Sequence, residues 1–184
     1  IVRLPIKLSI AFCISFSDSV SRELVASSRI NISGSLTKAL AASEIRVGEI
    51  VETVSYFGDF VDQRKAYGGN TYLKISGQSY TQDLCRYIYT DDGNTLVALF
   101  PESIVTPEQA GAKPVTSFYS GDAISVANAV ATALRYPLIF KGQDYDCGNK
   151  SFQINTYYTR WEGTNGTGTY LKWNAVPENG YAVQ

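Results

Sequence analysis

The spacing of apolar residues changes twice along the chain, and these changes limit the possible folds most strongly. Between residues 48 and 65 the apolar side chains fall on one face of a helix: Ile50, Val51, Val54, Phe57 and Val61. After Gly68 and Gly69 the pattern alternates, which is typical of strands, and from Gly121 it becomes helical again. The pattern therefore predicts helices inside 48–65 and over 122–135, with strands after each.

The strands are predicted from alternating runs that are bounded by turn residues. The strongest turn is Asp91-Asp92-Gly93-Asn94, because these residue types tolerate a positive φ, and it joins 86–90 to 95–100 in a hairpin. Further strands are expected at 71–76, 138–140, 151–161 and 169–176. The last two are expected to pair with each other around the glycine-rich tip 163–168, and 141–150 is expected to be a polar loop.

Short strands with two isolated helices in long connections suit a mainly β fold. We expect an antiparallel β-sandwich of the jelly-roll kind, in which the helices cover strand crossings, and a mixed α+β domain is the alternative. The Ser-rich residues 1–34 contain two apolar islands and are expected to form an extended N-terminal arm. Residues 35–184 are long enough to bury a sizeable core, so we expect a single domain there.

The chain contains no histidine, which excludes Ser-His-Asp and Cys-His nucleophile systems, histidine metal sites and histidine general bases. Its acid clusters are Asp91-Asp92 and Asp144-Tyr145-Asp146. We interpret the first as turn chemistry and the second as a solvated loop, because a calcium loop needs more oxygen ligands than either supplies. We therefore predict no enzymatic activity, catalytic residue, metal or cofactor, with a hydrolase that uses Asp144 or Asp146 as a minor alternative.

Charge and terminal composition bear on the partners of the chain. The net charge is −1, and the 16 Lys and Arg residues are scattered without a polybasic arm, so we expect only weak or indirect contact with RNA. The apolar runs in residues 1–16 are interrupted by charge and proline, so we expect no membrane insertion. The absence of methionine, even at position 1, is typical of a piece cleaved from a longer precursor or of a mature secreted protein.

Three cysteines, Cys13, Cys85 and Cys147, stand far apart in the chain. Their number and spacing fit neither a disulfide scaffold nor a metal site. We interpret them as buried small apolar side chains, with a single disulfide as the alternative.

Aromatic residues gather near the C-terminus: Tyr157, Tyr158, Trp161, Tyr170 and Trp173. Tyr and Trp combine a large apolar area with a polar tip, which suits the interfaces between protein subunits. With strict alternation along 151–161, Tyr157 and Trp161 lie on the face opposite Phe152. We predict that Tyr157 and Trp161 contact a neighbouring subunit.

Three segments, 48–54, 68–75 and 152–160, carry a family resemblance. The first has a Gly-Glu run followed by apolar residues, the second has Gly-Gly-Asn before an aromatic-rich strand, and the third ends in Thr-Tyr-Tyr-Thr-Arg. In this order they resemble patterns of the jelly-roll capsid proteins of picorna-like RNA viruses, especially the dicistrovirus-related group. Ser55 stands where that family usually has Arg, and Thr156 stands where it has Pro.

The resemblance implies a structural protein of the virion, a capsid subunit that builds an icosahedral shell around an RNA genome. Its implied partners are other capsid protein chains, in homo- and hetero-oligomeric contacts, and a host receptor. The alternative is a secreted or surface-exposed binding module, such as an adhesin or filament subunit. Three glycosylation sequons, at Asn31, Asn149 and Asn165, favour this alternative.

Overall fold

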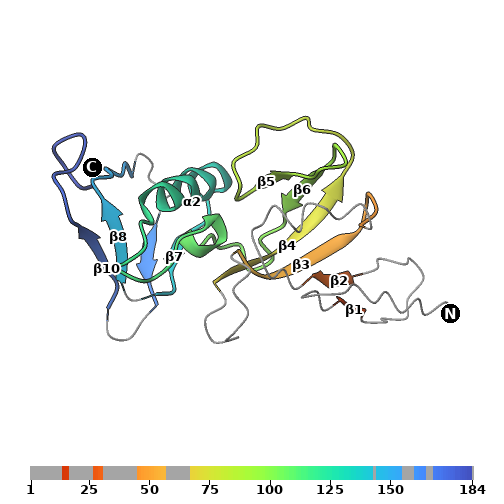
Figure 1. Cartoon of the computed structure of the whole chain (residues 1–184), viewed down its shortest axis with the longest axis horizontal. Helices are drawn as coiled ribbons and strands as arrows, with labels where there is room; N and C mark the ends of the chain where they lie inside the picture. Colours follow the sequence, from red (N-terminus) through yellow and green to blue (C-terminus); the bar gives the residue numbers. More distant parts are fainter. Residues whose placement is uncertain are drawn as a thin grey trace. The chain divides into compact units, whose positions relative to one another are not determined.

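The structure, a computed structural model, describes residues 45–56, 67–142, 144–154, 160–164 and 168–183, with the backbone alone of 14–16, 27–30 and 54. The chain divides into two compact units, which are coloured along the sequence in Figure 1. The first comprises Ile1–Thr81 and Tyr87–Leu99, and the second comprises Gln82–Arg86 and Phe100–Gln184. The predicted boundary between arm and domain, at residue 34, lies outside the described residues.

The first unit is a six-stranded sheet with the order β1-β2-β3-β4-β6-β5. Its strands are β1 (Ile14–Phe16), β2 (Ser27–Ile30), β3 (Ile50–Ser55), β4 (Gly68–Ile75), β5 (Tyr87–Tyr89) and β6 (Thr95–Ala98). Neighbouring strands are antiparallel except β2 and β3, which run parallel. The turn between β5 and β6 confirms the predicted hairpin, and Gly93 there has a φ of 78°.

Alternation along the central strands separates a buried face of this sheet from a half-buried face. On β4 the side chains of Tyr72 and Lys74 are buried, whereas those of Leu73 and Ile75 are half-buried. The strand register extends the buried face across the sheet through Val51, Tyr72, Ala98, Lys74, Leu96 and Ile88. The buried face therefore combines these apolar side chains with the buried Lys74 and with the polar Thr53 and Asn70.

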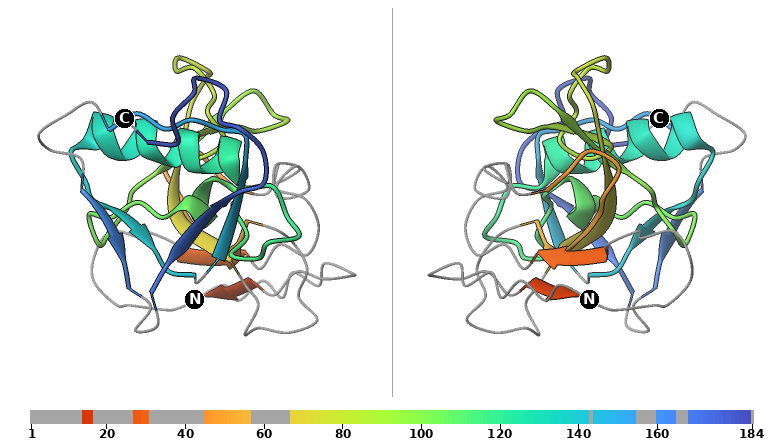
Figure 2. Two further views of the ribbon diagram at one scale, coloured as in Figure 1. Left: turned by 90° about the vertical axis from the view of Figure 1, so that its left-hand side faces the viewer. Right: turned by 90° about the vertical axis from the view of Figure 1, so that its right-hand side faces the viewer.

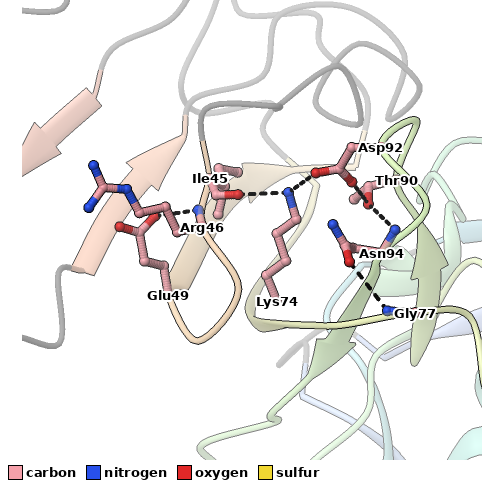
Figure 3. Close-up of polar contacts among 8 residues, drawn as sticks. All are labelled: Ile45, Arg46, Glu49, Lys74, Gly77, Thr90, Asp92 and Asn94. Carbon is pink, nitrogen blue, oxygen red and sulfur yellow. Dashed lines mark hydrogen bonds and ion pairs between the residues drawn. The ribbon is translucent and has the colours of Figure 1, made fainter.

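Two hydrogen bonds hold the ammonium group of Lys74 inside this face (Figure 3). Its Nζ donates to the carbonyl oxygen of Ile45 over 2.7 Å and to Oδ2 of Asp92 over 2.6 Å. The Lys74 side chain is fully buried, and that of Asp92 is 30% exposed. The Lys74 ammonium and the Thr90 hydroxyl hold the pKa of Asp92 well below its ordinary value. This ion pair links the turn between β5 and β6 to the central strand β4.

The second unit contains short strands and the predicted second helix. Its elements are η2 (Pro107–Ala110), α2 (Gly121–Leu134), β7 (Leu138–Phe140), β8 (Asp144–Gly148), β9 (Trp161–Gly163) and β10 (Tyr170–Trp173). The helix α2 confirms the prediction at 122–135, and it ends where Arg135 takes a left-handed φ of 58° two residues before Pro137. Its buried residues Ile124, Ala127 and Ala131 face η2, β7 and β8, beside which α2 lies in Figures 1 and 2.

Strands of the second unit pair in parallel with segments that lie much earlier in the chain. The ladders join Val105 to Leu138 to Trp161, Tyr119 to Asp146 to Lys172, and Phe152 to Val183. Each ladder therefore advances by one coil of the chain at every step. Three such parallel ladders around one winding chain are the arrangement of a parallel β-helix.

The interior of the coils is filled by side chains that point inward from the ladders. All three residues of β7 are buried, and on β8 the side chains of Tyr145 and Cys147 are buried between more exposed neighbours. Phe152, from the third ladder, is 1% exposed. Its ring lies against those of Trp161 and Trp173, with centroids 5.6 Å and 6.0 Å apart. Successive coils thus share one aromatic core.

The predicted antiparallel jelly-roll sandwich is wrong. In a jelly roll the strands pair antiparallel in two facing sheets, whereas the pairs β7–β9 and β8–β10 are parallel. The predicted hairpin over 151–176 is also wrong, because β9 pairs with β7 and β10 pairs with β8. The predicted loop 141–150 contains the strand β8. The sandwich and the hairpin share one cause of error, since the spacing of strand signals does not reveal which strand each one pairs with.

The predicted helix inside 48–65 is wrong as well. Residues Ile50–Ser55 form β3, in which Val51, Thr53 and Ser55 are buried, whereas Ile50 and Glu52 are half-buried. Adjacent β-branched residues such as Ile50 and Val51 favour the pleated surface of a strand over a helix. The remainder of the predicted helix, 57–65, lies outside the described residues. Among the described helices, none is long and apolar enough to cross a membrane.

The ion pair in the first unit predicts the effect of replacing Asp92. Asp92→Asn leaves the buried Lys74 ammonium without its charged partner, and we expect unfolding to become easier by about 2 kcal/mol, a value reduced for the partial exposure of Asp92. Because the pKa of Asp92 is lowered by folding, the wild-type contribution is present above the ordinary carboxyl pKa and is lost as the pH falls below it. Urea unfolding at pH 7 and at low pH measures both effects.

The neighbouring exposed residue provides the control for this substitution. Asp91→Asn alters the same turn by the same chemical change but leaves the ion pair of Lys74 intact. We expect it to change the unfolding free energy by less than about 0.5 kcal/mol. Equal losses for the two variants would show that turn chemistry, and not the ion pair, stabilises this hairpin.

A second buried ionisable group lies in η2 of the second unit. The carboxyl group of Glu108 is buried, its Oε1 accepts a hydrogen bond from the hydroxyl of Tyr145, and its Oε2 has no partner among the described residues. The amide N–H of Gly142 donates to the same Tyr145 hydroxyl over 2.8 Å. Burial raises the pKa of Glu108 above its ordinary value, although the bond from Tyr145 opposes this effect.

This raised pKa predicts a pH-dependent stability that disappears in Glu108→Gln. The folded wild type binds a proton at Glu108 more tightly than the unfolded chain does, so its stability is highest below the ordinary Glu pKa and falls as the pH rises through the raised one. We expect Glu108→Gln to melt at a higher temperature than wild type at pH 7 and to lose this slope. Thermal melts from pH 4 to pH 8 measure it, with the exposed Glu102→Gln as control. A wild-type slope that persists in Glu108→Gln would contradict the assignment.

Candidate functional site

The outward side of β8 and β10 brings together the polar residues of the second unit. On β8 the side chains of Asp144 and Asp146 point outward, opposite the buried Tyr145 and Cys147. The parallel register places Tyr170 beside Asp144 and Lys172 beside Asp146. Asn174 follows β10 with the same alternation of exposed residues. We name Asp144, Asp146, Tyr170, Lys172 and Asn174 the outer face.

Both carboxylates of the outer face are held by neighbouring groups. Lys172 Nζ lies 3.0 Å from Oδ1 of Asp144. The Asn174 side-chain nitrogen lies 3.2 Å from each carboxylate oxygen of Asp146, and the Gly148 amide N–H donates to Oδ1 of Asp146 over 2.8 Å. These contacts orient the two acids side by side along the strand. They offer hydrogen-bond acceptors, and Lys172 and Asn174 offer donors.

Tyr119 extends the outer face across the preceding coil. It pairs with Asp146 in the ladder, and its side chain is 44% exposed. Its ring covers two glycines, because an added Cβ would lie 2.8 Å from the ring at Gly148 and 2.7 Å from it at Gly121. Burial of the hydroxyl, together with the carboxylate of Asp122 3.3 Å away, raises the pKa of Tyr119. The glycines therefore allow the Tyr119 ring to approach the backbone of β8 and the start of α2 closely.

An ion cluster of Asp122, Lys150 and Glu178 continues this surface. Lys150 Nζ lies 3.2 Å from Oδ1 of Asp122 and 3.7 Å from Oε1 of Glu178. The hydrogen bond with Asp122 raises the pKa of Lys150. The indole N–H of Trp173 donates to the carbonyl oxygen of Lys150 over 2.6 Å, which ties the cluster to β10.

The chemistry of this surface suits hydroxyl-rich ligands. Exposed tyrosine rings at positions 119 and 170 offer apolar faces, and carboxylates, an amide and ammonium groups alternate around them. Within the described residues, no group of three His, Cys, Asp or Glu side chains is arranged to hold a metal ion. The outer face therefore offers binding contacts, and its two acids already have protein partners.

The predicted interface residue Trp161 lies in β9 and makes contacts within its own chain. Its indole N–H donates to Oδ1 of Asn128 over 2.9 Å, and its ring centroid lies 5.3 Å from that of Phe140. Tyr157 lies outside the described residues. A role of Tyr157 and Trp161 in subunit contacts stays a prediction.

The other described residues that the sequence analysis identified make contacts within the folded chain. Asp92 belongs to the turn and to the ion pair with Lys74. Cys85 and Cys147 are buried and free, as predicted, and burial raises the pKa of the Cys147 thiol to about 12. Cys13 lies outside the described residues.

Sequence reasoning missed Tyr119, Lys150, Lys172 and Asn174. A signal for two of them was present, because Tyr170, Lys172 and Asn174 alternate with Leu171 and Trp173 as on a half-exposed strand. Asp144 and Asp146 alternate with Tyr145 and Cys147 in the same way. Nothing in the sequence pattern showed that these two strands lie side by side.

No family model matches the chain, and no curated protein matches it. Among solved structures, a tailspike protein of an Acinetobacter phage is similar, with a TM-score of 0.54 and 21% identity over 72% of this chain. Tailspike gp49 of the Acinetobacter baumannii bacteriophage Fri1, a capsular polysaccharide depolymerase, has a TM-score of 0.52 and 14% identity over 71% of this chain. Pantoea stewartii WceF, a glycan biofilm modifying enzyme with a tailspike-like parallel β-helix fold, has a TM-score of 0.53 and 13% identity over 79%.

These comparisons agree with the ladders and correct the family prediction. The similar structures are tailspike-like proteins, so the predicted resemblance to picorna-like capsid proteins is wrong, as is the predicted icosahedral shell. The prediction of a protein without enzymatic activity is also contradicted, because two of these proteins are described as enzymes. The chain spans about a fifth of their lengths, with 22%, 22% and 21% covered. It has the fold of a segment of a tailspike-like parallel β-helix protein.

The close approach of Tyr119 to Gly148 predicts the effect of Gly148→Ala. Gly148 has a φ of 56°, and an added methyl group would collide with the Tyr119 ring. We expect a loss of about 2 to 3 kcal/mol, from the left-handed backbone and the collision together. Gly180→Ala, at a φ of 78° with open space around it, isolates the backbone contribution of about 1 kcal/mol. Equal losses for the two variants in urea unfolding would contradict the placement of Tyr119.

Proposed function

We propose that the chain is a segment of a tailspike-like protein that binds polysaccharide on its outer face. The observation that carries the proposal is the set of parallel ladders, which the similar structures share in the form of a tailspike-like parallel β-helix. Two of those proteins act on capsular polysaccharide or on a glycan biofilm. The secreted or surface-exposed binding module, the alternative in the sequence analysis, agrees with these neighbours better than a capsid shell does.

The geometry of the outer face supports binding of a sugar chain. Adjacent parallel strands hold their side chains in straight rows, so that a linear polymer can contact several residues at once. Tyr170 is 53% exposed and offers a ring face against which a sugar ring packs. Asp144, Lys172 and Asn174 offer acceptors and donors for hydroxyl groups at fixed spacing.

The proposal for the outer face concerns binding. Hydrolysis of a glycosidic bond uses two carboxyl groups that flank the bond, one of which donates a proton. Asp144 is paired with Lys172, and Asp146 accepts bonds from Asn174 and Gly148. Asp144 and Asp146 thus act as hydrogen-bond acceptors in this proposal, and depolymerising activity, which the similar enzymes suggest, is a proposal for the whole protein.

A location in the virion or outside the cell, and contacts with other protein chains, follow from the proposal. Tailspikes are parts of phage particles, and several of the similar structures are tailspikes. The RNA genome and the host receptor of a capsid have no place in this proposal.

Replacing Tyr170 tests the proposed function. We expect the wild-type chain to bind purified capsular polysaccharide from Acinetobacter baumannii or exopolysaccharide from Pantoea stewartii, and Tyr170→Ala to weaken that binding about tenfold through loss of stacking. Val176→Ala is the control, because Val176 is 81% exposed and lies beyond the outer face. Isothermal titration calorimetry measures the dissociation constants.

Two outcomes would contradict the proposal. Equal binding by wild type and Tyr170→Ala would place the polysaccharide elsewhere on the protein. A wild-type chain that binds neither polysaccharide, although it is folded by circular dichroism, would remove the glycan-binding role of this segment.

A further inference from the structure

An open groove of about 580 Å³ runs along α2 in the second unit. It is lined by Ser125, Asn128, Ala129, Thr132 and Ala133 from α2 and by Ser151, Phe152, Gln153 and Asn179 from the later coils. The lining contains no charged side chain. Its volume lies within the range of about 300 to 1,000 Å³ that is typical of small-ligand sites.

Asn128 has its carboxamide held in one orientation at this groove. Its Oδ1 accepts a hydrogen bond from the indole N–H of Trp161 over 2.9 Å, and its Nδ2 donates to the carbonyl oxygen of Gln153 over 2.9 Å. A carboxamide has two N–H donors and two acceptor lone pairs. One donor and one lone pair therefore remain for a ligand, on a group that the protein has already oriented.

Ser151, which lines the groove from a later coil, is also held by hydrogen bonds. The Ser151 hydroxyl donates to the carbonyl oxygen of Tyr181 over 2.6 Å and accepts the amide N–H of Asn179 over 3.2 Å. Phe152 also lines the groove, and its buried ring lies against Trp161 and Trp173. Asn128, Ser151 and Phe152 are thus fixed by contacts within the protein, which lowers the entropic cost of binding a ligand.

We infer that this groove binds a neutral saccharide segment of one or two sugar units. The inference rests on the proposed function and extends it to a second site with its own ligand class. Amides and hydroxyls supply both donors and acceptors, as sugar hydroxyl groups require. An anionic ligand would require a cation, and Lys150, next to Ser151 in the chain, is already paired with Asp122 and Glu178. The groove therefore selects an uncharged, hydroxyl-rich ligand.

The two tryptophans of the chain allow this inference to be tested separately from the proposed function. The chain contains 2 Trp residues, so its amide spectrum shows two indole N–H signals. The indole of Trp161 is bonded to Asn128 in the groove, and that of Trp173 is bonded to the Lys150 carbonyl beside the ion cluster. We propose titrating the ¹⁵N-labelled chain with neutral hexasaccharides of glucose, of galactose and of mannose. At least one should shift the Trp161 signal in a saturable manner.

A substitution at an exposed position of α2 blocks the groove without altering its supports. Ala129 is exposed and lines the groove, and Ala129→Arg places a long side chain in it while keeping good helix propensity. We expect the hexasaccharide to bind at least tenfold more weakly. Ala123→Arg adds the same charge to the same helix outside the groove and should bind as wild type does. The double variant Ser125→Ala and Asn179→Ala, which removes two polar lining groups, should weaken binding several-fold.

The outcomes separate the two proposals. Equal titrations of Ala129→Arg and Ala123→Arg, or no shift of the Trp161 signal at millimolar hexasaccharide, would overturn the groove as a saccharide site. The polysaccharide titration of Tyr170→Ala decides the outer face independently. The Trp161 response could be lost in Ala129→Arg and kept in Ala123→Arg, with the Trp173 signal unchanged. This result would support saccharide binding in the groove even if the outer face bound nothing.

Discussion

The second unit depends on backbone hydrogen bonds between segments that are one coil apart. The Leu138 amide N–H donates to the Arg160 carbonyl, and the Ile139 N–H donates to that of Val105, so β7 is paired on both of its edges. The strand segments of each coil satisfy backbone polar groups through the coils before and after them. Alternation along each strand then divides the side chains into two sets. Those that point into the coils form the core, and their neighbours in the sequence form an outer surface. The outer face is the solvent side of the same ladder whose inner side buries Tyr145 and Cys147.

The first unit depends on a different interaction, the ion pair of a buried lysine. Its central strand β4 carries Lys74 on the buried face, where an unpaired ammonium group would be costly. Asp92 can reach it because the β5–β6 turn returns over the sheet, and the Ile45 carbonyl takes a further N–H of the same ammonium group. The turn residues that make the hairpin easy to predict thus also supply the counter-ion. The turn that contains Asp92 and the buried ammonium group of Lys74 are thereby linked.

Local signals in the sequence predicted local structure, and long-range pairing was beyond their reach. The turn at 91–94 and the helix at 122–135 depend on residues within a few positions of each other, such as Gly93 or Pro137 after Arg135. The error at Ile50 and Val51 arose because an apolar spacing that fits a helix also occurs in short strands. The acids Asp144 and Asp146 were noticed, but their neighbours Tyr119 and Lys172 are brought to them by ladders that join distant coils. The sequence therefore identified some residues of the candidate site, but it did not predict which residues lie next to each other there.

Residues of the ion cluster and of the groove are neighbours in the chain. Lys150 of the ion cluster precedes Ser151 of the groove, Glu178 precedes Asn179, and both pairs belong to the same coils. The outer face and the ion cluster carry paired acids and lysines, whereas the groove carries amides and hydroxyls without charge. A polar group that is buried without a partner costs free energy, so the two kinds of contact disfavour different ligands. Under the two proposals, the outer face and the groove therefore differ in the class of sugar that each accepts.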